Sequence, residues 1–351
     1  MAAKIMIRVG IAIMVLLATG EEACAVVRKT IKSDDGDMID CVAVSLEIQQ
    51  PGRSMKDMVA DSDIAVATEE RPQSWRKDGG GCPSGTIPIR RSPAANAMNT
   101  TEAFSIAGNG VPPPHDLSSG KVEKAVAYGT NGPYHGLRAE VPIWNVDVHP
   151  NEFSMSYVMV GYTLDTSYVP GAGADAPTSL PNQIMAGLMT WPSVYGDSVP
   201  RLFVYYTNDS GVHYNCFNTE CGGFQLTSTK YALGSRWVRH PQFGGKQYGV
   251  YIGIHRDDTK LIWWVSVQDV DIGYFRDTVF DTRFPEASSL YAASIKEYLG
   301  VSAEGQLFLD DVGRSIATVP SCYGARPIGF GKYRSGYYTV YGGAGGIYCD
   351  H

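Results

Sequence analysis

The sequence predicts an all-β protein, an antiparallel β-sandwich preceded by a small disulfide-stapled module. Short stretches rich in Val, Ile, Tyr, Phe and Trp alternate with turns of Gly, Pro, Asn and Asp, which is the pattern of strands in a sandwich. The 21 tyrosines suit the half-buried faces of such strands. The clearest predicted strands are Leu202–Tyr206, Tyr248–Ile254 and Leu261–Val267, followed by Val141–Val146 and Phe153–Val160.

A single segment, Pro285–Leu299, has the features of a helix. It opens with a proline, which the first helical turn tolerates, and it is followed by Gly300, a common stop signal. One helix among many strands leaves the predicted architecture a β-sandwich.

The composition is that of a globular protein, with 44% hydrophobic and 19% charged residues. Lys and Arg number 29 against 36 Asp and Glu, so the net charge is -7. This balance argues against a surface that binds nucleic-acid phosphates, and we expect no nucleic-acid partner. The seven histidines show no metal-ligand spacing, so we expect no metal site.

The first residues indicate export. Lys4 and Arg8 precede the apolar run Val9–Ala18, and the small-residue pattern at Ala23–Ala25 predicts that a signal peptide, residues 1–25, is removed. A membrane anchor is the alternative, but the apolar run is about half the roughly twenty residues that a spanning helix needs. We expect a secreted protein without a membrane segment after cleavage, and the sequons at Asn99 and Asn208 predict a glycoprotein.

Signal cleavage would also remove one cysteine and leave six. An even number in an exported protein favours disulfides, although the sequence alone allows fifteen pairings. The economical pairing joins neighbours along the chain, namely Cys41 with Cys82, Cys216 with Cys221, and Cys322 with Cys349. A zinc site at the Cys216–Cys221 loop is the competing interpretation, but no second ligand pair completes it.

Three zones follow the predicted signal peptide. Residues 26–92 hold two cysteines and turn-rich segments, which predicts a small stapled module rather than a deep core. Residues 93–121 are rich in Gly, Pro and Ser and predict a linker that proteases can cut. Residues 122–351 carry most of the strand signals.

The common nucleophile, zinc-protease and phosphate-binding motifs are absent from the sequence. A different set of motifs runs in order along the chain: Thr30–Ser33, Gly36–Val42, Gly81–Arg91, Tyr134–Gly136, Ile143-Trp144, Asn151–Ser154, Asn182–Gly187, Tyr195–Asp197, Arg201–Phe203, Cys216–Cys221, Gly223-Phe224, Trp263-Trp264, Ile272–Tyr274, Pro327–Gly331 and Tyr341–Gly343. In this order and spacing the chain resembles the neprosin family of secreted plant glutamic peptidases. The first motifs resemble the family's activation peptide, and the later ones resemble its peptidase domain.

The resemblance implies a β-sandwich peptidase with an inhibitory propeptide that cleaves after proline at acidic pH, without a cofactor. It also implies two catalytic glutamates. One carboxylate would activate water, while the other, held protonated, would polarise the scissile carbonyl or protonate the leaving group. Two carboxyl groups held close together titrate as a coupled pair, which suits acidic conditions.

This sequence departs from the family pattern at both glutamates. The first position is Met185, and Leu188 stands where a tryptophan normally follows the Ala-Gly pair. The second position falls on Val301, at the end of Tyr298–Val301. A thioether cannot take a proton from water, so we interpret both residues as apolar filling of a space that two charges would occupy in the family.

Three functions remain open from the sequence. The first is a catalytically degenerate neprosin-domain protein that keeps a groove for a peptide, a proline-rich protein or cell-wall material. The second is an active acid peptidase with a substitute carboxylate, Glu304 first and Glu297 second. The third is a module that binds carbohydrate or cell-wall material through exposed aromatics. The candidate groove residues are Tyr195, Leu188, Trp263, Trp264 and Tyr274.

Overall fold

The structure is a computed structural model of the chain. It describes residues 26–48, 50–64, 71–76, 80–91, 125–129, 132–150, 153–164, 180–211, 214–280, 282–292, 295–310, 314–317, 324–330 and 337–342. The predicted signal peptide and linker lie outside the described residues, and so do Asn99, Cys322 and Cys349.

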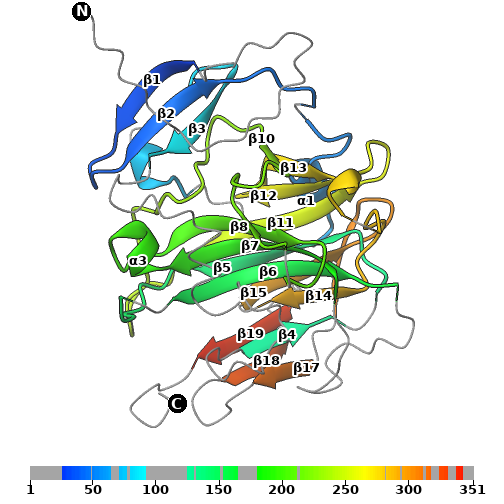
Figure 1. The fold of residues 1–351 in the computed structure, drawn as a ribbon. Coiled ribbons are helices and arrows are strands. Elements are labelled where there is room, and N and C mark those ends of the chain that lie inside the picture. The colour runs from blue at the N-terminus through cyan, green and yellow to red at the C-terminus, as the bar shows by residue number, and fades with distance from the viewer. Residues whose placement is uncertain are drawn as a thin grey trace, which may run out of the picture.

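The N-terminal part forms a small antiparallel sheet, here called sheet I. Its strands are β1 (Val27–Lys32), β2 (Met38–Ala43) and β3 (Thr86–Arg90), with β2 in the middle. Between β2 and β3 lie the short helix α1 (Met55–Ala60) and the 3-10 turn η1 (Ser74–Arg76). The Cys41–Cys82 disulfide joins β2 to the segment before β3. Sheet I is a separate sheet at the top of Figure 1, but Val42 and Ile87 from its strands join the main core, and α1 lies beside β13 of the larger sheets.

The rest of the described chain forms two large antiparallel sheets. Sheet II has nine strands, in the order β10-β13-β12-β11-β5-β15-β19-β18, with β16 paired to β15. They span β5 (Gly136–Pro142), β10 (Phe224–Leu226), β11 (Gly249–Asp257), β12 (Ile262–Val267), β13 (Val270–Arg276), β15 (Ile295–Val301), β16 (Leu307–Phe308), β18 (Gly324–Phe330) and β19 (Tyr337–Gly342).

Sheet III has seven strands, in the order β17-β4-β14-β6-β7-β8-β9. They span β4 (Ala125–Tyr128), β6 (Ser154–Tyr162), β7 (Asn182–Thr190), β8 (Arg201–Thr207), β9 (Cys216–Phe217), β14 (Ser289–Ala292) and β17 (Arg314–Ala317). The short helix α3 (Pro192–Tyr195) follows β7, and the 3-10 turn η3 (Asp277–Val279) follows β13.

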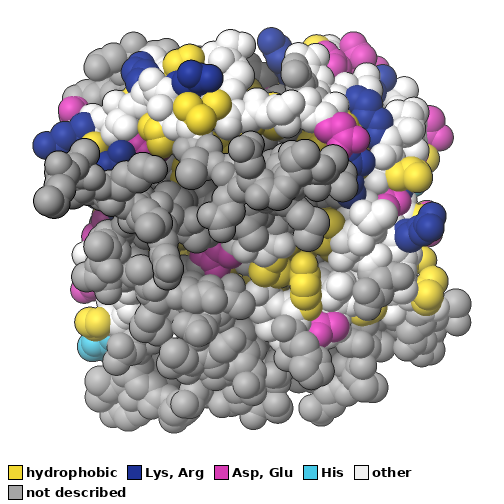
Figure 2. All heavy atoms as spheres, turned by 45° about the horizontal axis from the view of Figure 1, so that its top comes forward, with side chains coloured by type: hydrophobic (Ala, Val, Ile, Leu, Met, Phe, Trp, Pro, Cys, Tyr) yellow, Lys and Arg dark blue, Asp and Glu magenta, His cyan; other side chains and the backbone are white. Residues whose placement is uncertain are grey.

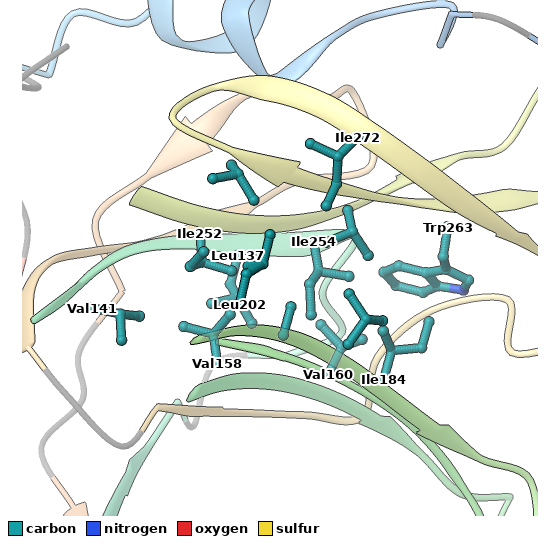
Figure 3. Packing of buried hydrophobic residues seen from close by; sticks show 14 of the residues in the cluster. Leu137, Val141, Val158, Val160, Ile184, Leu202, Ile252, Ile254, Trp263 and Ile272 are labelled. Atoms are coloured by element: carbon teal, nitrogen blue, oxygen red, sulfur yellow. The ribbon is translucent and has the colours of Figure 1, made fainter. Parts of the chain in front are cut away.

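The main core lies between sheets II and III, as Figure 3 shows for the side chains that meet there. Alternate residues of each strand point into it, for example Ile252 and Ile254 from β11 against Ile184 from β7. Each aliphatic side chain buried in this way contributes about 1.5–3 kcal/mol to folding. The residues between them point outward, so each sheet also has an outer face. The predicted antiparallel β-sandwich is therefore confirmed.

Most predicted strands coincide with β6, β8, β11 and β12, but two predictions were wrong. The strand expected at Val141–Val146 ends at Pro142, the last residue of β5. The helix expected at Pro285–Leu299 is instead β14 and β15, which pair with β6 and β5. Pairing with distant strands and the β-favouring Tyr and Ile residues outweigh a weak helical pattern.

Gly187 in β7 offers a test of how closely sheet III is built. A Cβ added there would lie 2.1 Å from the Ser156 carbonyl oxygen and 2.6 Å from the Tyr157 Cα, both backbone atoms of β6. We therefore expect Gly187→Ala to lower the free energy of unfolding by about 1–3 kcal/mol, measured by urea denaturation. Gly80→Ala is the control, because a Cβ there meets nothing within 4 Å. Equal unfolding midpoints for the two variants would contradict this packing.

Candidate functional site

Met185 lies at the middle of β7, on the outer face of sheet III. Its neighbours across the sheet are Met159 on β6 and Tyr205 on β8. Its side chain is only 1% exposed. It belongs to a buried group of apolar and aromatic side chains, here called the Met185 cluster: Val126, Tyr128, Tyr157, Met159, Leu180, Met185, Met189, Trp191, Tyr195, Phe203, Tyr205 and Phe217.

All members of the Met185 cluster are apolar or aromatic side chains. Its ionisable groups are tyrosines, and burial raises the pKa of Tyr157 and of Tyr205 above the ordinary tyrosine value. The Tyr205 hydroxyl donates to Asn215 Oδ1 at 2.6 Å. A neutral phenol beside a thioether supplies no general base at acidic or neutral pH. At Met185, where the resemblance places the family's first glutamate, the side chain itself can act as neither acid nor base.

The second family position lies elsewhere in the fold. Val301 ends β15 in sheet II, opposite Gly136 of β5. Its side chain packs with Met55 and Met58 of α1, in a cluster that also holds Val59, Leu299 and Leu307. Met185 and Val301 thus belong to different sheets and to different apolar clusters. The structure does not bring the two predicted positions into one site.

The substitute carboxylates are no better placed. Glu304 sits in the turn between β15 and β16, fully exposed to solvent. The Ser302 hydroxyl donates to it at 2.8 Å and lowers the pKa of its carboxyl. A lowered pKa keeps this carboxylate ionised, which is the opposite of what a proton donor needs. Glu297 lies in β15, but its side chain is outside the part that the structure describes.

The five candidate groove residues do not line one groove, and this prediction was wrong. Leu188 and Trp263 are buried in the core between the sheets, where the Trp263 indole donates to the Phe284 carbonyl at 2.7 Å. Trp264 and Tyr274 lie on the outer face of sheet II, against Ile48. Adjacent residues of a strand point to opposite faces, so Trp263 and Trp264 cannot share a surface.

Tyr195, the remaining groove candidate, closes α3. The guanidinium groups of Arg90 and Arg201 lie 5.5 and 5.2 Å from the centre of its ring. Burial raises the pKa of Tyr195 to about 12, so its phenol stays neutral. Arg201 also pairs with Asp37 of the N-terminal part at 2.7 Å. Tyr195 therefore marks a junction between sheet I and sheet III rather than an open groove.

The structure contains two of the three predicted disulfides, Cys41–Cys82 and Cys216–Cys221. The bond at Cys216–Cys221 excludes the zinc alternative there. Among the described residues, no cluster of His, Cys, Asp and Glu could hold a metal, and no helix is long and apolar enough to span a membrane. Asn208 is half-buried, with its amide 3.4 Å from the Val279 carbonyl, and its glycosylation stays a prediction.

The face shown in Figure 2 carries charged side chains of both signs. Basic and acidic side chains are interspersed over the visible described part of one face (Figure 2). Such mixing does not create the one-signed field that draws nucleic acids to a protein.

One polar group on sheet II was missed by the sequence reasoning. His255 on β11 bonds through Nε2 to Asp271 Oδ1 on β13 at 2.8 Å, across the outer face. A register shift between Val265 and Ser266 on β12 accompanies this pairing. No motif announces it, because register and bulges decide which side chains meet. The one local signal is that His255 follows Ile252 and Ile254 at the outward-facing position.

The comparisons with known proteins identify one family. The neprosin family model matches residues 150–293, which include β7 with Met185 and the Cys216–Cys221 disulfide, but not Val301. Among solved structures the chain is similar to "CG-16, a homodimeric agglutinin from chicken liver", at 10% identity, over 50% of this chain and 96% of that chain, with a TM-score of 0.24. A likeness this weak carries no argument about fold or ligand.

Met185→Glu tests the inert character of the Met185 cluster. Burial without a charged partner should raise the pKa of the new carboxyl above its unfolded value of about 4.3. Below that pH both states are protonated and ionisation costs nothing. As the pH rises toward 7, each unit of raised pKa costs about 1.4 kcal/mol. We therefore expect a stability deficit, relative to Met185→Gln, that grows from pH 4 to pH 7 in thermal melts.

The Met185→Gln variant is matched in size and does not titrate. If the stability difference between Met185→Gln and Met185→Glu is the same at pH 4 and pH 7, a cationic partner or water must reach the side chain at position 185. That result would contradict the apolar surroundings described above.

Proposed function

Since this chain belongs to the neprosin family, we propose that it is a secreted, peptidase-like protein that binds proline-containing peptides without cleaving them. The observation that carries the proposal is the position of Met185. The resemblance places the family's first glutamate at this residue, whose thioether is buried among apolar and aromatic side chains.

The absence of cleavage follows from what peptide hydrolysis requires. Water must lose a proton to a base, and the leaving amine must gain one from an acid. The thioether of Met185 does neither. Val301 is equally inert and lies in the other sheet. Restoring one position would therefore not rebuild a pair of cooperating carboxyl groups.

Peptide binding is supported by the chemistry that the Met185 cluster keeps. Aromatic side chains offer large rigid surfaces, and methionines adapt to irregular shapes. Phe153, Met155 and Val194 pack against the cluster and are only partly buried. Phe153 lies 5.7 Å from Trp191, ring centre to ring centre. A proline ring is compact and apolar, so it suits such a rim.

Export is part of the same proposal. Two disulfides in the described residues suit an oxidising compartment, where such bonds persist. The basic and apolar pattern of residues 1–25 supplies the independent sequence support.

The other two functions are not favoured by the geometry. A peptidase that relies on Glu304 would place its acid on an exposed turn with a lowered pKa. A carbohydrate module that relies on exposed aromatics would need Trp263, Trp264 and Tyr274 at the surface, where they do not lie.

Phe153→Ala tests peptide binding at the rim of the Met185 cluster. We expect this substitution to weaken the binding of a proline-rich peptide roughly tenfold in calorimetric titration, because a truncated aromatic contact costs about 1–2 kcal/mol. Phe243→Ala is the control, since Phe243 is 100% exposed and belongs to no described cluster. Loss of affinity in both variants, or in neither, would place the peptide elsewhere.

A further inference from the structure

On the outer face of sheet II, three buried polar atoms have no hydrogen-bond partner among the residues that the structure describes. They are His255 Nδ1, Trp264 Nε1 and Ser266 Oγ. Their residues are 0%, 0% and 1% exposed. A buried polar group without a partner is costly, and native proteins rarely leave several together without a reason.

The sheet register gathers the three residues in one place. His255 on β11 lies directly opposite Trp264 on β12. Ser266 follows two residues after Trp264, so it shares the same face, and its partner across β11 is Gly253. Asp271 on β13 stands opposite Ser266 and holds His255 by the 2.8 Å bond to Nε2. We call these four residues the His255 cluster: His255, Trp264, Ser266 and Asp271.

Met55 of α1 closes the His255 cluster. A Cβ added to Gly253 would lie 2.4 Å from Ser266 Oγ and 2.6 Å from Met55 Cε. The missing side chain of Gly253 therefore leaves a space that the Met55 methyl group fills, beside the serine hydroxyl. A methyl group cannot form hydrogen bonds, so the space beside these polar groups is filled by an apolar one.

Contacts made by the residues before α1 fix the position of Met55. The Gly52 amide donates to Asp257 Oδ2 at 2.8 Å, and Glu47 pairs with Arg276 at 2.5 Å. Ile48 packs against the cluster formed by Ile262, Trp264 and Tyr274. Met55 thus covers the His255 cluster because its segment is fastened to β11 and β13.

We propose that the His255 cluster is a binding site for a neutral amide group, as in a peptide backbone or an Asn or Gln side chain, and that Met55 occludes it in this structure. In the neutral tautomer whose Nε2–H donates to Asp271, the other ring nitrogen of His255 is an acceptor. Trp264 offers a donor, and Ser266 offers both. An amide presents the matching pair, an N–H for His255 Nδ1 and a carbonyl for the Trp264 indole or the Ser266 hydroxyl.

This site is independent of the proposed function. It lies on sheet II, whereas the Met185 cluster lies on sheet III. A negative result for peptide binding at Phe153 would not bear on the site at the His255 cluster. A negative result for that site would not bear on the proposal for the Met185 cluster.

Met55→Gln in the full chain tests the site directly. Glutamine is close to methionine in length and carries an amide where the thioether methyl lies. We expect its melting temperature to stay within about 2 °C of the wild type, because the buried amide finds partners. Met58→Gln is the matched control, since Met58 is buried in the same helix among apolar side chains. That variant should lose several degrees, because its amide is buried without partners.

A second substitution separates the site from general tolerance at position 55. Ser266→Ala in the wild type should leave the melting temperature unchanged or raise it, since the hydroxyl has no partner. The same substitution in Met55→Gln should lower it. Equal losses for Met55→Gln and Met58→Gln would overturn the proposal. So would a Ser266→Ala effect that is the same in both backgrounds.

A free probe gives an independent measurement. Met55→Ala opens the space over Gly253, and N-methylacetamide should then bind saturably and raise the melting temperature, whereas it should not do so with Met58→Ala. Ser266→Ala in the Met55→Ala chain should weaken that binding about fivefold. A probe response that is identical in Met55→Ala and Met58→Ala would contradict the site.

Discussion

The packing of sheet II against sheet III is the constraint on which the rest of the structure depends. Every strand that contributes to the shared core must give that core one of its two faces. Polar or reactive side chains are therefore confined to the outer faces, where the core does not exclude them. The same alternation that buries Ile184 and Leu188 turns Met185 outward, and the alternation that buries Ile252 and Ile254 turns His255 outward.

The two outer faces have different chemical characters. The face of sheet III around Met185 is aromatic and apolar, and its phenols are kept neutral by burial. The face of sheet II carries charged and polar groups, with Arg138 paired to Asp269 at 2.7 Å and His255 to Asp271. The N-terminal part fits the second face, since its α1 supplies both the methionine over Gly253 and the apolar contacts to Val301. Met185 and Val301 lie in different sheets, so these two positions do not form one site for a pair of catalytic carboxylates.

Patterns over a few consecutive residues predicted the features that depend on those residues alone. Alternation identified β8, β11 and β12, and the spacing of Cys216 and Cys221 identified their bond, because each depends on a few consecutive residues. The helix prediction near Leu299 was wrong because this segment forms β14 and β15, which pair with β6 and β5, more than a hundred residues away in the sequence. The predicted groove is not formed because neighbours in sequence, such as Trp263 and Trp264, point to opposite faces of their strand. The His255 cluster needs strand register, a bulge and a distant helix, none of which the sequence displays.

A cleavage assay shows whether this chain, whose residues 150–293 match the neprosin family model, lacks a catalytic carboxylate pair as we propose. A quenched proline-containing peptide is incubated with the full chain and with the Met185→Glu/Val301→Glu double variant, from about pH 2.5 to pH 7. We expect no turnover by either protein. Neither position is an acid in the unaltered chain, and the two acids lie on separate sheets in the double variant. Turnover with an acidic optimum by the unaltered chain would contradict the claim. Turnover gained by the double variant would show that the two positions do meet.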